Sequence, residues 1–454
     1  MVMATAAVDS FAPVSLFSNI NNVLLKKRGF FDHQNNGSRV NPKQLIGDAI
    51  RHRIETIDPE YCEPGEEDAF FVADLGEVYR QHLRWKLNLP RVKPFYAVKA
   101  NPDPKVLELL AAMGTGFDCA SKNEIDLMRG MGVDPQRIIY AQPCKTMSYI
   151  RHARQQGVKQ MTFDNDDELR KIARLYPDAE LFLRIMTDDS ASLCRLSLKF
   201  GAPLDTCASL IQTARELGLN LVGVSFHVGS GASDPMAFLK SVQDAHYVFK
   251  LAENYGYDMK TLDVGGGFCG ESFEPMAKVL REALDEYFPT TDIIAEPGRY
   301  YVSSAFTIAC NIIARRTVEP SPSTTIDDER SYMLYINDGA YGNFSSIIFD
   351  HQHPVAKILT VGDRFIYGTT QADESVPGSP DAVDYSIWGP SCDGLDRVME
   401  RQKFDAILET GDWLYFEDMG AYTRCSATKF NGFRDDHDVL YVCSEPGARA
   451  MLRI

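Results

Sequence analysis

One lysine stands at the end of a short apolar run, where its amine could act as a nucleophile. Residues 94–101 read Pro-Phe-Tyr-Ala-Val-Lys-Ala-Asn, and the side chains of 95–98 predict a strand buried on both faces. Asp103 can cap a following helix and Pro104 can occupy its first position, so the strand must end near Lys99. Apolar surroundings lower the pKa of an amine and favour Schiff-base chemistry with a carbonyl. A lysine that closes a strand is more often simply solvated, so its position alone does not assign this role.

Polar residues and glycines follow several other predicted strands. The strand ends carry Asp118, Gln142, Arg184, His227 with Ser230, the glycines Gly265, Gly266 and Gly267, and the segment Glu296-Pro-Gly-Arg299. The three glycines would let backbone amides approach a phosphate, with Ser230 and Arg299 as further donors. A carboxylate such as Glu296 would keep a pyridine nitrogen protonated, and His227 could stack on a flat ring. Each residue also has an ordinary structural explanation, but the whole set matches what pyridoxal phosphate requires.

The elements that must position these residues alternate between strand and helix. Strands are predicted at 95–98, 116–120, 137–142, 160–163, 181–185, 222–227, 261–264 and 292–295. Helices are predicted at 104–113, 122–131, 166–175, 204–217, 235–255 and 273–288. Eight strands in this alternation predict an α/β domain, a closed (β/α)8 TIM-like barrel whose working face lies at the carboxyl ends of its strands. A doubly wound open sheet is the alternative, because periodicity does not show closure.

The rest of the chain has a different pattern. Short strands are predicted at 69–74, 306–317, 332–337, 358–361, 387–389, 413–416 and 439–443, and a helix at 75–88. The later strands predict an all-β domain, a β-sheet or β-barrel, after the barrel. The expected organisation is a flexible tail at 1–45, a segment at 46–92 that partly joins the β domain, a pyridoxal phosphate-binding barrel at 93–303 and the β domain at 304–454. The polar stretches 319–330 and 371–383 predict mobile insertions.

Composition and charge exclude several classes of function. The formal net charge of −16 argues against nucleic acid or an anionic membrane surface as a partner and favours a cationic small molecule. No apolar run approaches the roughly 20 residues that span a bilayer, and the first forty residues lack signal-peptide features, so we expect a cytoplasmic protein. The ten cysteines form no Cys-x-x-Cys pair and the histidines do not cluster, so neither a disulfide framework nor a metal site is indicated.

Eight motifs carry a resemblance to a known family. They are residues 94–101, Gly116-Phe-Asp-Cys-Ala-Ser121, Cys194-Arg-Leu-Ser197 with Lys199-Phe-Gly201, Ser225-Phe-His-Val-Gly-Ser230, Asp263-Val-Gly-Gly-Gly-Phe268, Glu296-Pro-Gly-Arg-Tyr300, residues 388–396 and Gly420-Ala-Tyr422. In this order they resemble the eukaryotic ornithine decarboxylases, which belong to the fold-type III, group IV pyridoxal phosphate-dependent decarboxylases. The resemblance covers about residues 65–450.

The resemblance implies pyridoxal 5'-phosphate as the cofactor. Lys99 would hold the cofactor covalently, Glu296 would pair with its pyridine nitrogen and His227 would stack on its ring. The phosphate would be held by the glycines together with Ser230, Arg299 and Tyr422. The implied cofactor-binding set is Lys99, Asp118, Arg184, His227, Ser230, Gly265, Gly266, Gly267, Glu296, Gly298, Arg299 and Tyr422.

The resemblance also implies decarboxylation of L-ornithine to putrescine, the first step of polyamine biosynthesis. Cys392 would deliver a proton to the substrate carbon from the other subunit of a head-to-tail homodimer with shared active sites. Asp350 and Asp393 would bind the distal ammonium, and Phe430 would form a wall of that pocket. Phe349 stands where many relatives have tyrosine. Decarboxylation of lysine or another basic amino acid in a specialised pathway is therefore an alternative.

A further alternative is an inactive homologue that binds the regulatory protein antizyme. The segment 147–170 corresponds to the region with which this family binds antizyme. Homologues of that inactive kind typically lack cofactor residues. This chain retains every cofactor residue named above, which favours an enzyme.

Overall fold

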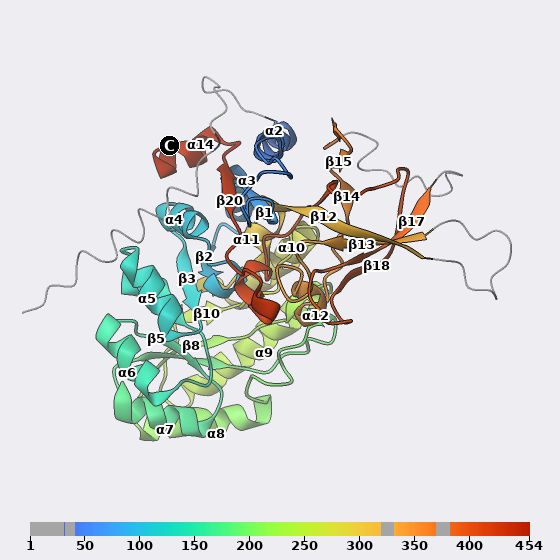
Figure 1. Cartoon of the computed structure of the whole chain (residues 1–454). Helices are drawn as coiled ribbons and strands as arrows, with labels where there is room; N and C mark the ends of the chain where they lie inside the picture. The colour runs from blue at the N-terminus through green and yellow to red at the C-terminus, as the bar shows by residue number, and fades with distance from the viewer. Residues whose placement is uncertain (1–30, 32–40, 319–330, 369–381) are drawn as a thin grey trace, which may run out of the picture.

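The computed structural model describes residue 31 and residues 41–318, 331–368 and 382–454. Most of the predicted tail, all of the predicted insertion at 319–330 and most of the one at 371–383 lie outside these residues. Figure 1 shows a barrel wrapped by helices α5 to α9, with strands β12, β13, β17 and β18 extending to one side of it. Among the described residues, no helix combines the length and the apolar character needed to cross a membrane.

The eight predicted barrel strands are all present, and the barrel is closed. They are β2 (Val92–Ala97), β3 (Gly116–Cys119), β4 (Ile138–Tyr140), β5 (Gln160–Phe163), β6 (Glu180–Arg184), β8 (Asn220–Ser225), β10 (Thr261–Asp263) and β11 (Asp292–Ala295). Each strand runs parallel to its neighbours, and β11 pairs with β2 to complete the ring. The predicted barrel is confirmed, and the open sheet is wrong. Strand β2 begins before Phe95 because Val92 and Lys93 already pair with β11.

Helices connect the barrel strands. They are α4 (Pro104–Ala112), α5 (Lys122–Gly130), α6 (Met147–Gln156), α7 (Asp166–Leu175), α8 (Cys207–Glu216), α9 (Met236–Glu253) and α10 (Phe273–Tyr287). The predicted start of α4 is confirmed, since the Asp103 side chain accepts hydrogen bonds from the N–H groups of Lys105 and Val106 and Pro104 is the first helical residue. The segment that carries Lys99 therefore ends at this helix cap.

Bulky side chains fill the barrel interior beneath the carboxyl ends of the strands. Phe95, Ile139, Phe182 and Ile294 form a separate buried cluster there. Gly223 on β8 makes this packing possible, because a Cβ atom at this position would lie 2.1 Å from the Thr261 carbonyl oxygen and 2.9 Å from the Phe182 ring. The interior is therefore a packed floor under the strand ends.

Gly223→Ala is expected to destabilise the barrel by about 1–3 kcal/mol, because the added methyl group overpacks against backbone and a buried ring. Chemical denaturation followed by circular dichroism measures the effect. Gly130→Ala is the matched control, since nothing lies within 4 Å of a Cβ at this helical position. It should be neutral or slightly stabilising. Equal stability of the two variants would contradict the packing argument.

The second domain is built on a mixed eight-stranded sheet. Its strands are β1 (Phe70–Asp74), β12 (Phe306–Val318), β13 (Ser331–Ile336), β14 (Lys357–Ile358), β17 (Val383–Trp388), β18 (Arg397–Phe404), β19 (Trp413–Phe416) and β20 (Val439–Val442). A short hairpin of β15 (Thr360–Val361) and β16 (Arg364–Phe365) lies outside this sheet. The predicted all-β character is confirmed. Strand β18 was not predicted, because its sequence RVMERQKF is rich in charged residues.

Strand β1 precedes the barrel in sequence but belongs to this sheet. It pairs antiparallel with β12 and parallel with β20, and all five of its residues are buried. The helices associated with this part are α2 (Pro42–Glu55), α3 (Leu75–Asn88), α11 (Arg299–Val302), α12 (Ser346–Phe349) and α14 (Pro446–Leu452). Helix α2 begins inside the predicted tail, where Asn41 accepts a hydrogen bond from the Lys43 N–H. The predicted strand at 69–74 and helix at 75–88 are confirmed.

Candidate active site

Lys99 lies in a short 3-10 turn (Val98–Ala100) directly after β2, at the carboxyl end of the barrel. Its Nζ atom donates a hydrogen bond to Asp118 Oδ2, and the two residues also form an ion pair. Asp118 lies on the neighbouring strand β3, where it pairs in register with Ala97. The Lys99 side chain faces an open pocket, so 45% of it is accessible to solvent, whereas Asp118 is fully buried.

The electrostatic environment of Lys99 differs from the sequence prediction. Burial lowers the pKa of this amine, as predicted, but the Asp118 carboxylate and further contributions from Tyr422 and Glu296 outweigh it. The net pKa lies above that of free lysine, so the prediction of a lowered pKa was wrong. The amine is therefore charged in this arrangement, and Asp118 is the group that can take its proton.

Two carboxyl groups, Asp263 at the end of β10 and Glu296 directly after β11, each have a buried oxygen atom without a hydrogen-bond partner among the described residues. Burial, followed by the charge of Asp263, raises the pKa of Glu296 well above its usual value. Burial likewise raises the pKa of Asp263 to about 7, although its Oδ1 atom accepts the Gly265 N–H at 2.9 Å. The repulsion between the two carboxyl groups favours a proton on one of them. Asp263 is not among the predicted site residues, although it is the first residue of the glycine motif at 263–268.

His227 lies shortly after β8, and its imidazole ring is neutral. Burial, assisted by the positive charges of Arg184 and Lys99, lowers its pKa well below the usual value. The Gly229 N–H donates to His227 Nδ1 at 3.0 Å, so the neutral ring carries its proton on Nε2. Gly266 lies against this ring, because a Cβ atom there would be 2.8 Å from His227 Nε2. The ring and the glycine backbone therefore form one continuous wall.

Most of the predicted cofactor residues line a single pocket. It is lined by Lys99, His227, Ser230, Gly266, Gly267, Glu296, Gly298, Arg299 and Tyr422, together with Ala97, Gly231 and Phe268. Gly265, Asp118 and Arg184 are not part of this lining. Gly265 supports it from behind, since its carbonyl accepts the Glu296 N–H at 2.6 Å. The Arg184 guanidinium lies 5.2 Å from the centroid of the Phe200 ring. Its positive charge influences the pocket by helping to lower the pKa of His227.

Arg299 begins helix α11 at one end of this pocket. Its guanidinium lies 5.0 Å above the Tyr422 ring, and its Nη2 atom donates to Ser230 Oγ at 3.3 Å. Tyr422 is held in a left-handed backbone conformation, and its N–H donates to the Ala100 carbonyl at 2.9 Å. This contact attaches the β domain to the turn that carries Lys99. Ser230 lies in a small two-stranded antiparallel sheet of β7 (Ser192–Cys194) and β9 (Ser230–Ala232), which was not predicted.

The predicted substrate residues fall into two groups. Asp350 is buried beside Arg299, with which it forms an ion pair, and thus belongs to the Lys99 side of the molecule. Phe349, its neighbour, is 64% exposed. Cys392, Asp393 and Phe430 do not line the pocket of Lys99 in this single chain. Phe430 lines another pocket instead, in the β domain, and Asp393 contacts Tyr341 in the lining of that pocket.

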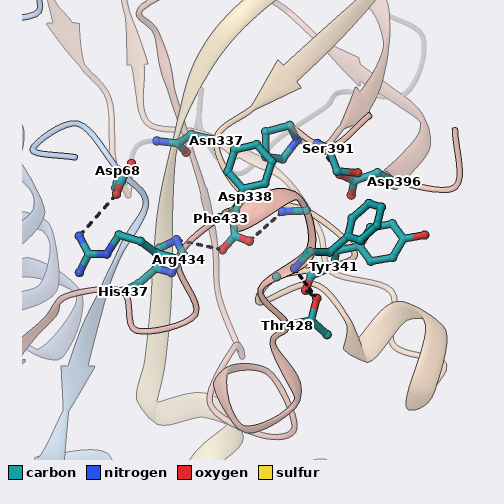
Figure 2. Close-up of a pocket in the computed structure, with 14 residues that line it drawn as sticks. Asp68, Asn337, Asp338, Tyr341, Ser391, Asp396, Thr428, Phe433, Arg434 and His437 are labelled. Atoms are coloured by element: carbon teal, nitrogen blue, oxygen red, sulfur yellow. Dashed lines mark hydrogen bonds and ion pairs between the residues drawn. The ribbon is translucent and has the colours of Figure 1, made fainter. Parts of the chain in front are cut away.

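Figure 2 shows that second pocket, where Tyr341, Ser391 and Thr428 come from three different loops. Tyr341 donates its hydroxyl to Asp393 Oδ2 and stacks on Phe430 with ring centroids 4.3 Å apart. Both the N–H and the hydroxyl of Thr428 donate to the Tyr341 carbonyl at 2.9 Å. These contacts fix Asp393 and Phe430 relative to each other. Tyr341 was missed in the sequence because tyrosine in a loop carries no distinctive signal.

Asn431 holds the loop of Cys392 in place. Its Oδ1 atom accepts the Cys392 N–H at 2.9 Å, and its backbone has φ +54°. Asn431→Gly keeps this backbone conformation accessible but removes the acceptor, so alkylation of Cys392 by iodoacetamide should become about fivefold faster, the equivalent of one hydrogen bond. Peptide mass spectrometry measures the rate. Asn431→Asp retains the acceptor and should match the original chain; equal rates in both variants would show that the bond does not restrain the loop.

The residues of the Lys99 pocket fit pyridoxal phosphate. Within the described part of the chain, Glu296 Oε1 and Arg299 Nε are buried and have no hydrogen-bond partner. A ligand with a protonated ring nitrogen and a phosphate offers partners of the matching kinds. Gly266 leaves the space that a Cβ would fill, which permits close approach to the backbone.

Comparisons with known proteins agree with this chemistry. Residues 75–303 match the family model of the pyridoxal binding domain of pyridoxal-dependent decarboxylases. The chain is 67% identical over 452 residues to ornithine decarboxylase from Neurospora crassa, covering 96% of this chain and 93% of that protein. It is 49% identical to antizyme inhibitor 2 from Xenopus laevis, over 86% of this chain and 84% of that protein.

A solved structure shows the same fold. The arginine decarboxylase of Paramecium bursaria Chlorella virus matches with a TM-score of 0.76 at 32% sequence identity, and the match covers 87% of this chain and 100% of that one. The barrel and the following sheet domain agree with this likeness. The chain belongs to the pyridoxal-dependent decarboxylases, and pyridoxal phosphate is its cofactor.

Proposed function

We propose that this protein decarboxylates L-ornithine to putrescine and CO2, the first step of polyamine biosynthesis. The 67% identity to ornithine decarboxylase over 96% of the chain carries the proposal. The retained cofactor residues support it, because they line one pocket at the carboxyl end of the barrel. The net charge of −16 suits a cationic substrate.

The chain's own residues have distinct tasks in this reaction. When bound, pyridoxal phosphate supplies an electron sink for the electron pair that remains when CO2 leaves. Lys99 would hold the cofactor, with Asp118 as acceptor of the lysine proton. Glu296 would keep a proton at the pyridine nitrogen, and the neutral His227 ring would cover one face of the cofactor. Gly266, Gly267, Gly298, Ser230, Arg299 and Tyr422 would form the phosphate site, and Gly265 would support it from behind.

Substrate recognition would depend on two carboxylates. Asp350 is buried near the phosphate site, and Asp393 is oriented by the Tyr341 hydroxyl, so both are positioned to bind a distal ammonium. Cys392 would donate the proton that replaces CO2 on the substrate carbon. Phe430 would form a wall, and Phe349, without a hydroxyl, would leave one polar contact to the substrate unmade.

The proposed site needs two copies of the chain. Cys392 and Asp393 do not line the Lys99 pocket of their own chain, and a head-to-tail homodimer would bring them to the pocket of the partner. Phe349, Leu395 and Phe430 are exposed by 64%, 71% and 41%, although each lies close in sequence to a proposed substrate residue. An interface between subunits would cover these apolar side chains.

The deciding experiment measures CO2 release from ornithine and from lysine, side by side, by the purified chain supplied with pyridoxal phosphate. We expect a strong preference for ornithine. A preference for lysine would keep the reaction type and overturn the substrate, with Phe349 as the first residue to examine. No release from either, together with absent cofactor absorbance, would favour an inactive antizyme-binding homologue.

Antizyme binding, a cytoplasmic location and the domain limits accompany this proposal. The segment 147–170 spans α6 and the first half of α7, and its Met147 and Tyr149 side chains are exposed, which suits a docking site for antizyme. All ten cysteines are free, which suits the reducing cytoplasm. Domain limits near residues 92 and 303 are proposed with it, because β2 begins at Val92 and β12 at Phe306.

A further inference from the structure

Arg299 connects the proposed phosphate site with the proposed ammonium site, whose residues lie far apart in the sequence. Its Nη2 atom contacts both Ser230 Oγ, in the proposed phosphate site, and Asp350 Oδ2, in the proposed ammonium site. The side chains of Arg299 and Asp350 are only 10% and 8% exposed. Water screens such a buried pair poorly. A change of charge at the phosphate site therefore alters the electrostatic energy at Asp350, and the reverse also holds.

Asp350 has few other ways to balance its charge. Its Oδ1 atom accepts only a weak hydrogen bond, from Cys194 Sγ at 3.4 Å. Cys194 lies opposite Ser230 in the two-stranded sheet of β7 and β9, so this one sheet contacts both the carboxylate and the phosphate site. In the described part of the chain, Arg299 is the one cationic side chain that forms an ion pair with Asp350.

We propose that Asp350 and the cofactor phosphate compete for the charge of Arg299, so that phosphate binding and binding of the substrate's distal ammonium strengthen each other. A phosphate at Arg299 places a second anion beside Asp350, which leaves that carboxylate with less compensating positive charge. An ammonium at Asp350 restores the balance and frees Arg299 for the phosphate. The coupling is reciprocal, as any equilibrium linkage between two sites must be. This inference rests on the proposed function of the site, and it makes Asp350 a determinant of cofactor affinity.

The first test compares the affinity for pyridoxal phosphate without any substrate. The full chain, freed of cofactor by dialysis against hydroxylamine, is titrated with pyridoxal phosphate while tryptophan fluorescence is followed. Asp350→Asn should bind the cofactor about five- to tenfold more tightly than the original chain, because the competing charge is gone. Asp393→Asn is the matched control, since it removes the same charge from the proposed substrate site without contact to Arg299. It should leave cofactor affinity unchanged, and Asp350→Glu, which retains the charge, should remain close to the original value.

The second test measures the coupling itself with two simple probes. Inorganic phosphate binding is measured by calorimetry with and without saturating putrescine, at constant ionic strength. Putrescine should tighten phosphate binding about fivefold in the original chain and in Asp393→Asn, and should have no effect in Asp350→Asn. Identical phosphate and cofactor affinities in all variants, with and without putrescine, would overturn the proposal.

Failure of this proposal can be told apart from failure of the proposed function, because neither titration requires turnover. Intact coupling with no decarboxylation of ornithine would contradict only the function. Rapid decarboxylation with no coupling would contradict only the competition for Arg299. Circular dichroism of Asp350→Asn confirms that the variant is folded before either titration is interpreted.

Discussion

Lys99→Ala is expected to reduce CO2 release from ornithine by on the order of 10³-fold or more, the largest effect of any single change in this chain. The amine lies at the end of β2, in the pocket lined by His227, Glu296 and Arg299, and no other lysine among the described residues lines that pocket. Removing it would also leave Asp118 buried and without its cationic partner. The variant should therefore lose the visible absorbance of covalently held cofactor together with its activity.

Lys93→Ala is the matched control for this experiment. Lys93 lies on the same strand, but its side chain is 65% exposed and pairs with Asp292 at the other end of the barrel. Its loss should leave activity and absorbance unchanged, since exposed ion pairs contribute little. Full activity of Lys99→Ala would refute the assignment of Lys99, and an unfolded Lys99→Ala protein would be recognised by circular dichroism.

The second large effect is expected for Cys392→Ala, which should lower kcat for ornithine by about 10²- to 10³-fold, because a positioned proton donor is lost. The cofactor absorbance should stay unchanged, since Cys392 does not line the pocket of Lys99. The contrast with Lys99→Ala therefore separates proton donation from cofactor binding. Stopped-flow absorbance and CO2 release, measured on the same preparation, test both parts.

Cys144→Ala is the control for Cys392→Ala, because Cys144 is also an exposed thiol but is not one of the proposed substrate residues. Mixing Lys99→Ala with Cys392→Ala provides a further check on the shared site. If active sites form between two chains, mixed dimers regain one intact site, and about a quarter of the original activity should return at equal amounts of each variant, as expected for random assortment of subunits. No recovery would indicate that each chain completes its own site.

The barrel was predictable because each strand is a short apolar run between amphipathic helices, which is a local pattern. Strand β18 was not, because an edge strand with exposed charged residues resembles a loop in sequence. Strand β17 was predicted at 387–389 but begins at Val383, since its pairing with β13 extends over more polar residues. Such limits depend on partners that are distant in the chain.

The candidate site was likewise predictable where it depends on local residue types, and not where it depends on partners that are distant in the chain. The residue types at the strand ends were enough to indicate a phosphate, a pyridine ring and a reactive amine. The sign of the Lys99 pKa shift was wrong, because Asp118 reaches it only through the register of β2 and β3. The contact between Arg299 and Asp350 joins the two domains and was equally invisible in the sequence.

The position of β1 between β12 and β20 has a consequence for biosynthesis. The ribosome makes residues 70–74 before the barrel, yet their parallel partner, residues 439–442, is made only after the barrel and the other strands of the sheet. One edge of an apolar strand thus stays open while the barrel and the rest of the sheet are made. A nascent or prematurely terminated chain would expose this edge to chaperones and to aggregation, even when its barrel is complete.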